Sequence, residues 1–257
     1  MKKYFVLALV LLAAVLHGAY AEARPVVRLG FYYTEHVTKN EAQIHADIEE
    51  VLTRGGIRIG ATLVPVFIKK TPSTLSFPLV QGIVETETRG SVVAGSGIDG
   101  NDALESLARH QTIAKDAAEV DFVIVFTPAL LIPKGVVAVQ PLGIIVNKYK
   151  AIVGWTVANG KFALAEYDGV RKLLEHTILH ELGHHIGLYH TDDVDSETCV
   201  RTHFLMCQDV QLVTEQHTVC EKTAAGVLEC NNSLVERFRE YVVDAAFISA
   251  LARFEKQ

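Results

Sequence analysis

An eleven-residue run, HELGHHIGLYH at positions 180–190, constrains this chain more than any other feature of its sequence. His180 and His184 are four residues apart, so on an α-helix their rings project from one face, about 6 Å apart. Gly187 follows them, and glycine readily takes the left-handed conformation that ends a helix. The chain can then turn back and bring His190 towards the first two histidines. The run therefore predicts a helix end, a tight turn and three imidazoles at one point.

Three imidazoles at this spacing are typical of a zinc site. His180, His184 and His190 can all reach one Zn²⁺ ion at about 2.0–2.1 Å, and three protein ligands leave a fourth position open, as in catalytic zinc sites. Glu181 lies about 100° round the helix from His180. From there its carboxylate can reach a water molecule on the metal without being a ligand. The alternative is a histidine-rich helix end whose side chains are satisfied by ordinary hydrogen bonds.

Upstream of this run, the hydrophobic pattern predicts alternating strands and helices. The expected strands and helices are, in chain order, 25–33 (strand), 41–52 (helix), 61–68 (strand), 102–118 (helix) and 121–127 (strand). Asn40 is the expected N-cap of the first helix and Gly55-Gly56 its stop. Pro65 disfavours a central place in a sheet, because proline cannot donate to a strand ladder. Most of residues 70–100 is rich in Gly, Ser, Thr and Pro and is expected to be loop.

A hairpin and a capped helix lead into the histidine run. Asn159-Gly160 lies between the strand-like runs Ala151–Val157 and Lys161–Tyr167, and Asn-Gly is a strong signal for a tight hairpin turn. Asp168 is the expected cap of a helix over about 169–187. The resulting order indicates a mixed α/β sheet. Beyond residue 190 we expect irregular chain to about residue 232, and then an amphipathic helix over 234–254.

The N-terminus is typical of a secretory signal peptide. Lys2 and Lys3 precede an unbroken apolar run over positions 4–16, and Ala19-Tyr20-Ala21 matches a cleavage site. The sequence therefore predicts a signal peptide over 1–21, a mature chain over 22–257 and a secreted or periplasmic location. An uncleaved anchor is the alternative, although spanning a bilayer takes about 20 residues. No other segment is apolar for long enough to span, so the mature chain is expected to have no stable membrane span.

Composition and cysteine content narrow the protein class further. The chain has 257 residues, 49% of them apolar, and a net charge of −6. These values indicate a packed globular protein, expected to be a monomer, and argue against a nucleic-acid binder, which needs a basic footprint. The four cysteines all lie on the C-terminal side of the histidine run, at positions 199, 207, 220 and 230. We expect two disulfides there, because export permits them, but the spacing does not choose among three pairings.

The pattern HExxHxxGxxH at 180–190 resembles the zinc signature of the metzincin metallopeptidases. That clan also has a Met-turn, a tight turn that places a methionine under the zinc ligands. The matching segment here is 202–207, because Met206 follows the histidine run along the chain and is the one methionine besides Met1. The alternative for Met206 is an ordinary core-filling role.

The order of elements resembles the reprolysin (adamalysin-like) branch, with the matrixins as second choice. The extra helix expected before the third strand favours reprolysins. However, Thr191 follows the last histidine where reprolysins usually carry Asp, which comes one residue later at Asp192. Gln208 stands where astacins and serralysins carry a tyrosine. The resemblance therefore identifies the metzincin clan and leaves the family within it open.

The resemblance implies an α/β (α+β) fold in which a zinc cleft separates two subdomains. Residues 22–190 would form an upper subdomain with a mixed twisted sheet, helices and the zinc helix. Residues 191–257 would form a small, irregular, cysteine-bearing lower subdomain with the Met-turn and a C-terminal helix. Ala151–Val157 would be the edge strand that pairs with an extended substrate, and residues 207–212 would line the pocket beyond the scissile bond.

The implied activity is that of a secreted zinc endopeptidase acting on proteins or peptides. Glu181 would be the general base for a zinc-activated water. The alternative is a binding, adhesin or toxin-like protein on the same scaffold, with little or no turnover. Asp192, Asp193 and Asp195 make a calcium site possible, but their spacing matches no known loop, so a solvated loop is expected. His176 is expected at the surface or behind the ligands, and His185 solvated or hydrogen-bonded.

Overall fold

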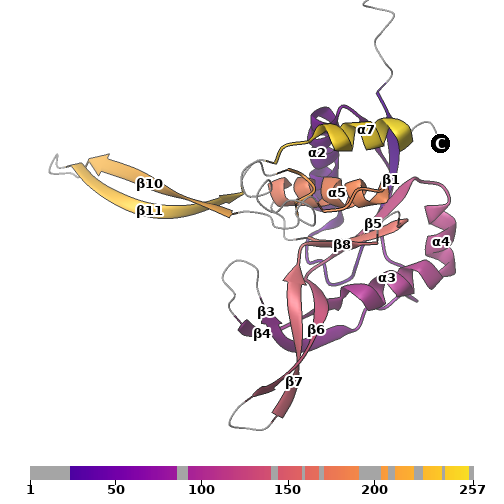
Figure 1. The fold of residues 1–257 in the computed structure, drawn as a ribbon, viewed down its shortest axis with the longest axis horizontal. Coiled ribbons are helices and arrows are strands. Elements are labelled where there is room, and N and C mark those ends of the chain that lie inside the picture. The colour runs from indigo at the N-terminus through magenta and orange to yellow at the C-terminus, as the bar shows by residue number, and fades with distance from the viewer. Residues whose placement is uncertain are drawn as a thin grey trace, which may run out of the picture.

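The computed structural model describes most of the chain from residue 24 onwards (Figure 1). The described ranges are 24–85, 92–139, 144–157, 160–167, 171–190, 204–207, 212–222, 228–238 and 241–254. The predicted signal peptide, Asp168 and the acidic loop at 192–195 lie outside these ranges. Within them, no helix is both long enough and apolar enough to cross a membrane.

A five-stranded sheet forms the centre of the molecule. Its strands, in spatial order, are β2 (Thr62–Lys70), β1 (Val26–Tyr33), β5 (Phe122–Thr127), β9 (Phe162–Glu166) and β8 (Gly154–Thr156). The first four are parallel, and β8 runs antiparallel to β9 at one edge. Every residue of β5 is buried, as expected for a continuous apolar run in a covered parallel sheet. The predicted mixed sheet is therefore confirmed. Pro65 lies in β2, the opposite edge strand.

Helices cover both faces of this sheet (Figure 1). The helices are α2 (Glu41–Ile59), α3 (Gly100–Arg109), α4 (Gln111–Ala117), α5 (Arg171–His185) and α7 (Ala245–Phe254). Alternate residues of β5 face opposite cores, because side chains alternate along a strand. Phe122, Ile124 and Phe126 pack in one core with α2, α5 and α7. Val123 and Val125 pack in the other with α3 and α4.

Helix α2 corrects the expected helix end at Gly55-Gly56. Asn40 is its N-cap, as predicted, and its side chain accepts a hydrogen bond from the backbone N–H of Gln43. The helix passes through both glycines and ends at Gly60, which has a φ of 69°. Gly55 faces the side chain of Leu179 on α5, and Gly56 faces a backbone carbonyl. Gly55 therefore permits close packing against the histidine-bearing helix, and Gly56 permits close packing against the chain that enters β2.

The expected loop over residues 70–100 is wrong. Strands β3 (Leu79–Glu85) and β4 (Val92–Asp99) occupy much of it, and β6 (Leu130–Val139) and β7 (Ile144–Ile152) follow later in the chain. The four strands form a closed group in which β3 and β6 each pair with both β4 and β7. Glycines in β3 and β4 face Tyr149, Val84 and Leu131 at close range. These glycines fit tight strand packing, but in the sequence they look like loop residues.

Other segments also differ from the sequence prediction. The helix expected over 102–118 is two helices, α3 and α4, separated at His110, whose backbone is extended. The region expected to be irregular before residue 232 contains β10 (Leu212–Lys222), which pairs with β11 (Leu228–Phe238). The last helix begins only at Ala245. In Figure 1, β10 and β11 extend away from the helices as a separate arm.

Candidate metal centre

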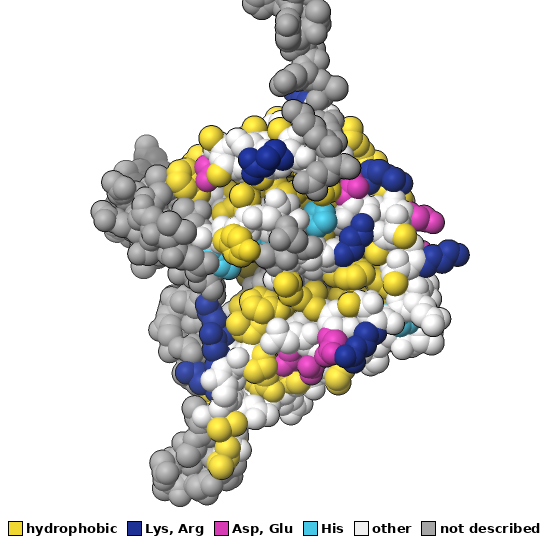
Figure 2. All heavy atoms as spheres, turned by 45° about the vertical axis from the view of Figure 1, so that its right-hand side comes forward, with side chains coloured by type: hydrophobic (Ala, Val, Ile, Leu, Met, Phe, Trp, Pro, Cys, Tyr) yellow, Lys and Arg dark blue, Asp and Glu magenta, His cyan; other side chains and the backbone are white. Residues whose placement is uncertain are grey.

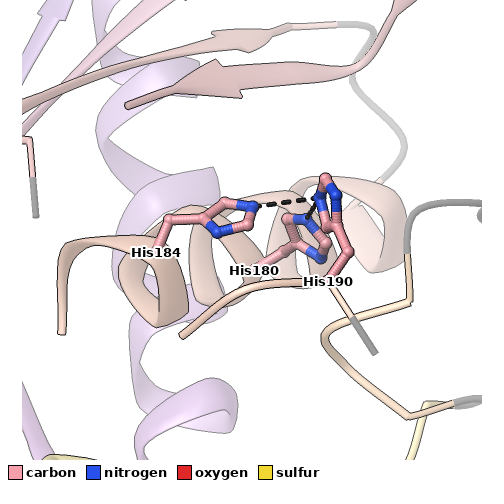
Figure 3. A group of neighbouring side chains, drawn as sticks. All are labelled: His180, His184 and His190. Atoms are coloured by element: carbon pink, nitrogen blue, oxygen red, sulfur yellow. Dashed lines mark hydrogen bonds between the residues drawn. The ribbon is translucent and has the colours of Figure 1, made fainter. Parts of the chain in front are cut away.

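Three histidines from one helix and the turn after it meet at one point (Figure 3). His180 and His184 lie on α5, and His190 lies on the segment that follows. Gly187 has a φ of 90°, and its N–H donates to the carbonyl of His184, so the predicted left-handed turn is present. The Nε2 atom of His190 lies 3.1 Å from the Nε2 atoms of both His180 and His184. Among the described residues, these three form the group that could hold a metal ion.

The Nδ1 atoms of His180 and His184 determine what the Nε2 atoms of the same two rings can do. Nδ1 of His180 lies 2.7 Å from the carbonyl oxygen of Leu205, and Nδ1 of His184 lies 2.8 Å from that of Leu188. A carbonyl oxygen only accepts, so each Nδ1 carries the proton and each Nε2 presents a lone pair. A second partner on the far ring nitrogen is typical of histidines that bind metals.

The donor set fits a zinc ion. Nitrogen ligands about 2.0–2.1 Å from a tetrahedral ion would lie roughly 3.3 Å from one another, close to the 3.1 Å separations here. Lone pairs of neutral imidazoles repel one another unless a cation lies between them. Burial lowers the pKa of His180 well below its ordinary value, and the adjacent His176 and His184 lower it further. The neutral ring is the form that binds a metal.

Met206 lies directly beneath this helix. It is 3% exposed and belongs to the core formed with α2, α5 and α7. A side chain at Gly183 would collide with the sulfur of Met206, so that glycine lets the helix rest on the methionine. The preceding residue, Leu205, supplies the carbonyl that holds His180. Of the predicted Met-turn segment, residues 204–207 are described and contain a turn next to a bridge between Phe204 and Val242.

Glu181 is buried between its helix and the edge strand. It is 3% exposed, and its Oε2 has no hydrogen-bond partner among the described residues. Burial raises its pKa to about 8. A side chain at Gly154, on β8, would collide with Oε1 of Glu181 and with Thr177. The carboxylate therefore packs against the backbone of β8, and Gly154 is a site residue that the sequence prediction missed.

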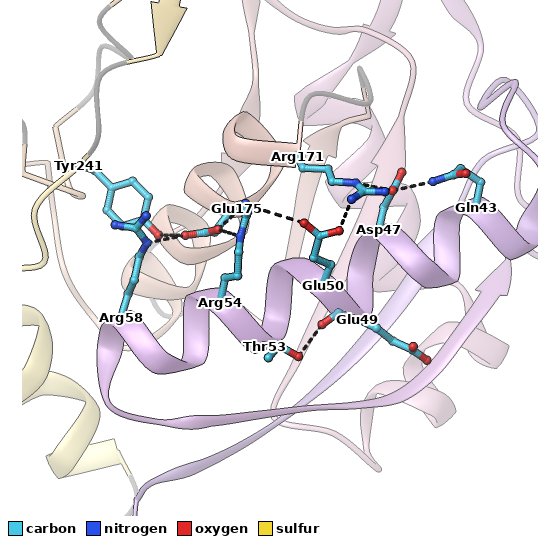
Figure 4. Close-up of polar contacts among 10 residues, drawn as sticks. All are labelled: Gln43, Asp47, Glu49, Glu50, Thr53, Arg54, Arg58, Arg171, Glu175 and Tyr241. Carbon is cyan, nitrogen blue, oxygen red and sulfur yellow. Dashed lines mark hydrogen bonds and ion pairs between the residues drawn. The ribbon is translucent and has the colours of Figure 1, made fainter.

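An ion-pair network around the buried Glu175 holds α5 against α2 (Figure 4). Glu175, on α5, is 2% exposed and receives Nε of Arg58 at 2.9 Å and Nη2 of Arg54 at 2.7 Å. The hydroxyl of Tyr241 donates to the same carboxylate at 2.6 Å. The Glu175 carboxylate on α5 thus contacts side chains from both α2 and the segment before α7. The network fixes the helix that carries His180 and His184.

A second buried carboxylate, Asp47, lies further along the same helix pair. It accepts hydrogen bonds from Tyr167 at 2.6 Å, from Gln43 at 2.7 Å and from Arg171 at 2.9 Å. Burial by itself would raise the pKa of Asp47, but these three donors and Lys39 outweigh it and lower the pKa below its ordinary value. Asp47 therefore stabilises the fold in its ionised form.

We expect this stabilisation to disappear in acid. Because the folded-state pKa of Asp47 is lowered, its contribution is present above the pKa of the unfolded chain and is lost as pH falls through the folded-state value. Asp47→Asn should lower the free energy of unfolding at pH 7 by about 2 kcal/mol and by less at pH 3. Urea unfolding at both pH values measures this difference. Glu119→Gln, at an exposed carboxylate, should change neither value; an equal loss at both pH values for Asp47→Asn would contradict the prediction.

Other histidines near the site were also considered in the sequence, and the structure describes two of them, His176 and His185. His176 does not join the three ligands. Its ring lies against those of His180, at 5.7 Å between centroids, and Tyr241, at 5.3 Å. His185 is hydrogen-bonded, as expected, with Nδ1 2.8 Å from the carbonyl of Gly160. Residues 208–211 and His203 lie outside the described ranges.

The cysteines are described in part. Cys207 is 5% exposed and disulfide-bonded. Cys220 and Cys230 lie directly opposite each other in the β10–β11 register. This register brings Cys220 and Cys230 close together, whereas the sequence alone left three pairings open. The two disulfides themselves stay a prediction.

Comparison with protein families matches residues 67–191 to the model described as Metallo-peptidase family M12B Reprolysin-like. The matched segment includes Gly154, Glu181 and all three histidines. It supports a metallopeptidase of metzincin-like type, and that family implies zinc at the histidines. No curated protein matches the chain.

Two solved structures resemble the chain remotely. Archaemetzincin (amzA) from Methanopyrus kandleri is 13% identical, with a TM-score of 0.43, over 90% of this chain and 96% of its own. Metalloproteinase-II from Bacteroides fragilis is 15% identical, with a TM-score of 0.34, over 73% of this chain and 48% of its own. At these TM-scores neither similarity carries a functional argument.

Proposed function

We propose that the protein is an exported zinc endopeptidase that cuts protein or peptide substrates. The observation that carries the proposal is the convergence of three histidine Nε2 atoms, two of them with Nδ1 held by a backbone carbonyl. His180, His184 and His190 would hold the ion. When bound, zinc activates water for attack and polarises the scissile carbonyl. The reprolysin branch is the preferred proposal within the clan, because the matching family model is reprolysin-like.

Glu181 is the proposed general base. It follows His180 directly on the helix, and its carboxylate is buried with one oxygen lacking a partner among the described residues. Leaving such a group unsatisfied is unfavourable, so a site that needs no proton acceptor would gain stability by replacing it. In the proposed reaction, Glu181 acts in its ionised form, which a zinc ion beside it would favour over the protonated form that burial alone favours. It accepts a proton from the attacking water and passes it to the leaving amine. This argues for an enzyme and against the binding-scaffold alternative.

Strand β8 is the proposed substrate-binding edge. It is the last strand of the sheet, paired with β9 along one side, and Gly154 brings its backbone against Glu181. An open strand edge can pair with an extended peptide through main-chain hydrogen bonds, largely regardless of sequence. A peptide on β8 would therefore lie beside the proposed base.

Export is a separate part of the proposal. It rests on the sequence of residues 1–21, and cysteine pairing on the C-terminal side of the histidine run is compatible with an oxidising location. N-terminal sequencing of the protein recovered outside the cytoplasm should begin at Glu22. A retained Met1 would favour the anchor alternative.

Metal removal tests the central proposal. The purified protein should bind one zinc ion and cleave casein, lose that activity with a chelator, and regain it with zinc. His190→Ala should weaken zinc binding by more than about 100-fold, since even the loss of an outer hydrogen bond to a ligand costs about 10- to 100-fold. His45→Ala, on α2 and outside the group, is the control. A protein that binds zinc but cuts no faster than Glu181→Ala would instead be a binding scaffold.

A further inference from the structure

Tyr241 lies shortly before α7 and points towards α5 (Figure 4). Its hydroxyl donates a hydrogen bond to the Glu175 carboxylate at 2.6 Å, and the guanidinium of Arg58 lies 5.2 Å from the centre of its ring. Burial and the Glu175 carboxylate raise the pKa of Tyr241 above its ordinary value, so the hydroxyl keeps its proton and stays a donor. Tyr241 is therefore fixed to the helix that carries His180 and His184.

The next residue along the chain, Val242, holds the segment that supports His180. The carbonyl of Val242 accepts a hydrogen bond from the backbone N–H of Leu205 at 2.9 Å, and Val242 also forms the bridge with Phe204. The carbonyl of Leu205 in turn lies 2.7 Å from Nδ1 of His180. The backbone of Leu205 therefore connects Val242 on one side to the His180 ring on the other.

A second set of contacts joins Tyr241 to His180 through the ring of His176. The His176 ring meets that of Tyr241 edge-on, with 5.3 Å between centroids, and stacks on that of His180 at 5.7 Å. His180 itself is 8% exposed, and histidine side chains occupy little of the face shown in Figure 2. The His180 ring is therefore oriented by contacts inside the molecule, and both of these routes begin at the Tyr241–Val242 segment.

We propose that Tyr241 is a positioning residue for His180, because it holds the segment that keeps the Leu205 carbonyl against Nδ1 of that ring. The inference rests on the proposed function in taking His180 as a zinc ligand. A partner on the far nitrogen of a metal-binding histidine fixes its tautomer and orientation, and loss of such a partner costs about 10- to 100-fold in metal affinity. The Tyr241 hydroxyl lies behind that partner, so its loss should act at the lower end of this range.

Tyr241→Phe tests the inference, because it removes the hydroxyl and keeps the ring beside His176. Zinc affinity, measured by competition with a chelator, should fall about tenfold. NMR of the imidazole nitrogens in the metal-free protein gives a readout without zinc. His180 should carry its proton on Nδ1 in the unchanged protein and should show a mixture of both tautomers in Tyr241→Phe. A purely structural role for Tyr241 would lower stability and change neither quantity.

Tyr167→Phe is the matched control for this variant. The Tyr167 hydroxyl also donates to a buried carboxylate at 2.6 Å, that of Asp47. This bond lies at the beginning of α5, where Arg171 binds the same carboxylate. Tyr167→Phe should therefore lower stability and leave both the zinc affinity and the His180 tautomer unchanged. Glu175→Gln should also keep the zinc affinity, because the glutamine oxygen can still accept the Tyr241 hydroxyl.

Circular dichroism should show all three variants folded. The inference is overturned if Tyr241→Phe binds zinc as tightly as the unchanged protein and keeps the same His180 tautomer. It is also overturned if Tyr167→Phe loses as much zinc affinity, since the effect would then be general loss of stability. Failure of the endopeptidase proposal is distinguishable, because an unchanged protein that binds zinc without cutting peptides would refute that proposal alone. Neither the zinc affinity nor the tautomer depends on turnover.

Discussion

Glu181→Gln is expected to slow peptide hydrolysis by about a thousandfold, within the range that a positioned acid–base group contributes. Glutamine keeps the shape of the buried side chain but cannot take up a proton. Zinc content should stay at one ion per chain, because the three histidines carry the proposed ligand atoms. Steady-state cleavage of a fluorogenic peptide and metal analysis of the same preparation measure both quantities.

Glu175→Gln provides a closely matched control for that variant. Glu175 and Glu181 are both on α5, and they are 2% and 3% exposed. Glu175 is bound by Arg54, Arg58 and Tyr241 rather than facing β8. Its replacement should therefore lower stability and leave the rate largely intact below the unfolding temperature. Loss of zinc from Glu181→Gln would instead assign this glutamate to the metal ligands and refute the general-base role.

The histidine group was predictable because its geometry is mostly local. Helical spacing fixes the separation of His180 and His184, and Gly187 permits the turn that returns His190. The carbonyl that holds His180 was not predictable in the same way. It belongs to Leu205, far from this helix turn along the chain, and nothing in a single sequence specifies which backbone oxygen will meet a given ring.

The fold was predictable where the apolar pattern had one clear period. The uniformly buried β5 and the Asn40 cap are examples, and the mixed sheet followed from the order of strands and helices. Strands β3 and β4 were missed because their glycines sit where large side chains from neighbouring strands fill the space. These two strands are held by contacts with β6 and β7, which lie far away in the sequence. The local sequence, rich in Gly and Ser, does not show those contacts and by itself indicates a loop.

The role of Gly154, like that of the glycines in β3 and β4, depends on a contact with a segment distant in the sequence, here the later helix α5. A Cβ at this position would lie 2.8 Å from the Thr177 side chain and would also collide with the Glu181 carboxylate. Gly154→Ala should therefore push Glu181 out of place. A misplacement of about 1 Å can cost about 100-fold in rate, so we expect kcat to fall by about that factor while zinc affinity is unchanged. Overpacking should also cost about 1–3 kcal/mol of stability.

Gly95→Ala separates misplacement of the base from simple overpacking. Gly95 is another strand glycine, in β4, and a Cβ there would also lie 2.8 Å from a side chain, that of Val84. It should lose comparable stability without losing rate. A double-mutant cycle completes the argument: in the Glu181→Gln background, Gly154→Ala should cost little further activity, because the two changes act through one carboxylate. Additive losses would mean that Gly154 matters to β8 and its substrate instead, and would remove it as a positioning residue for Glu181.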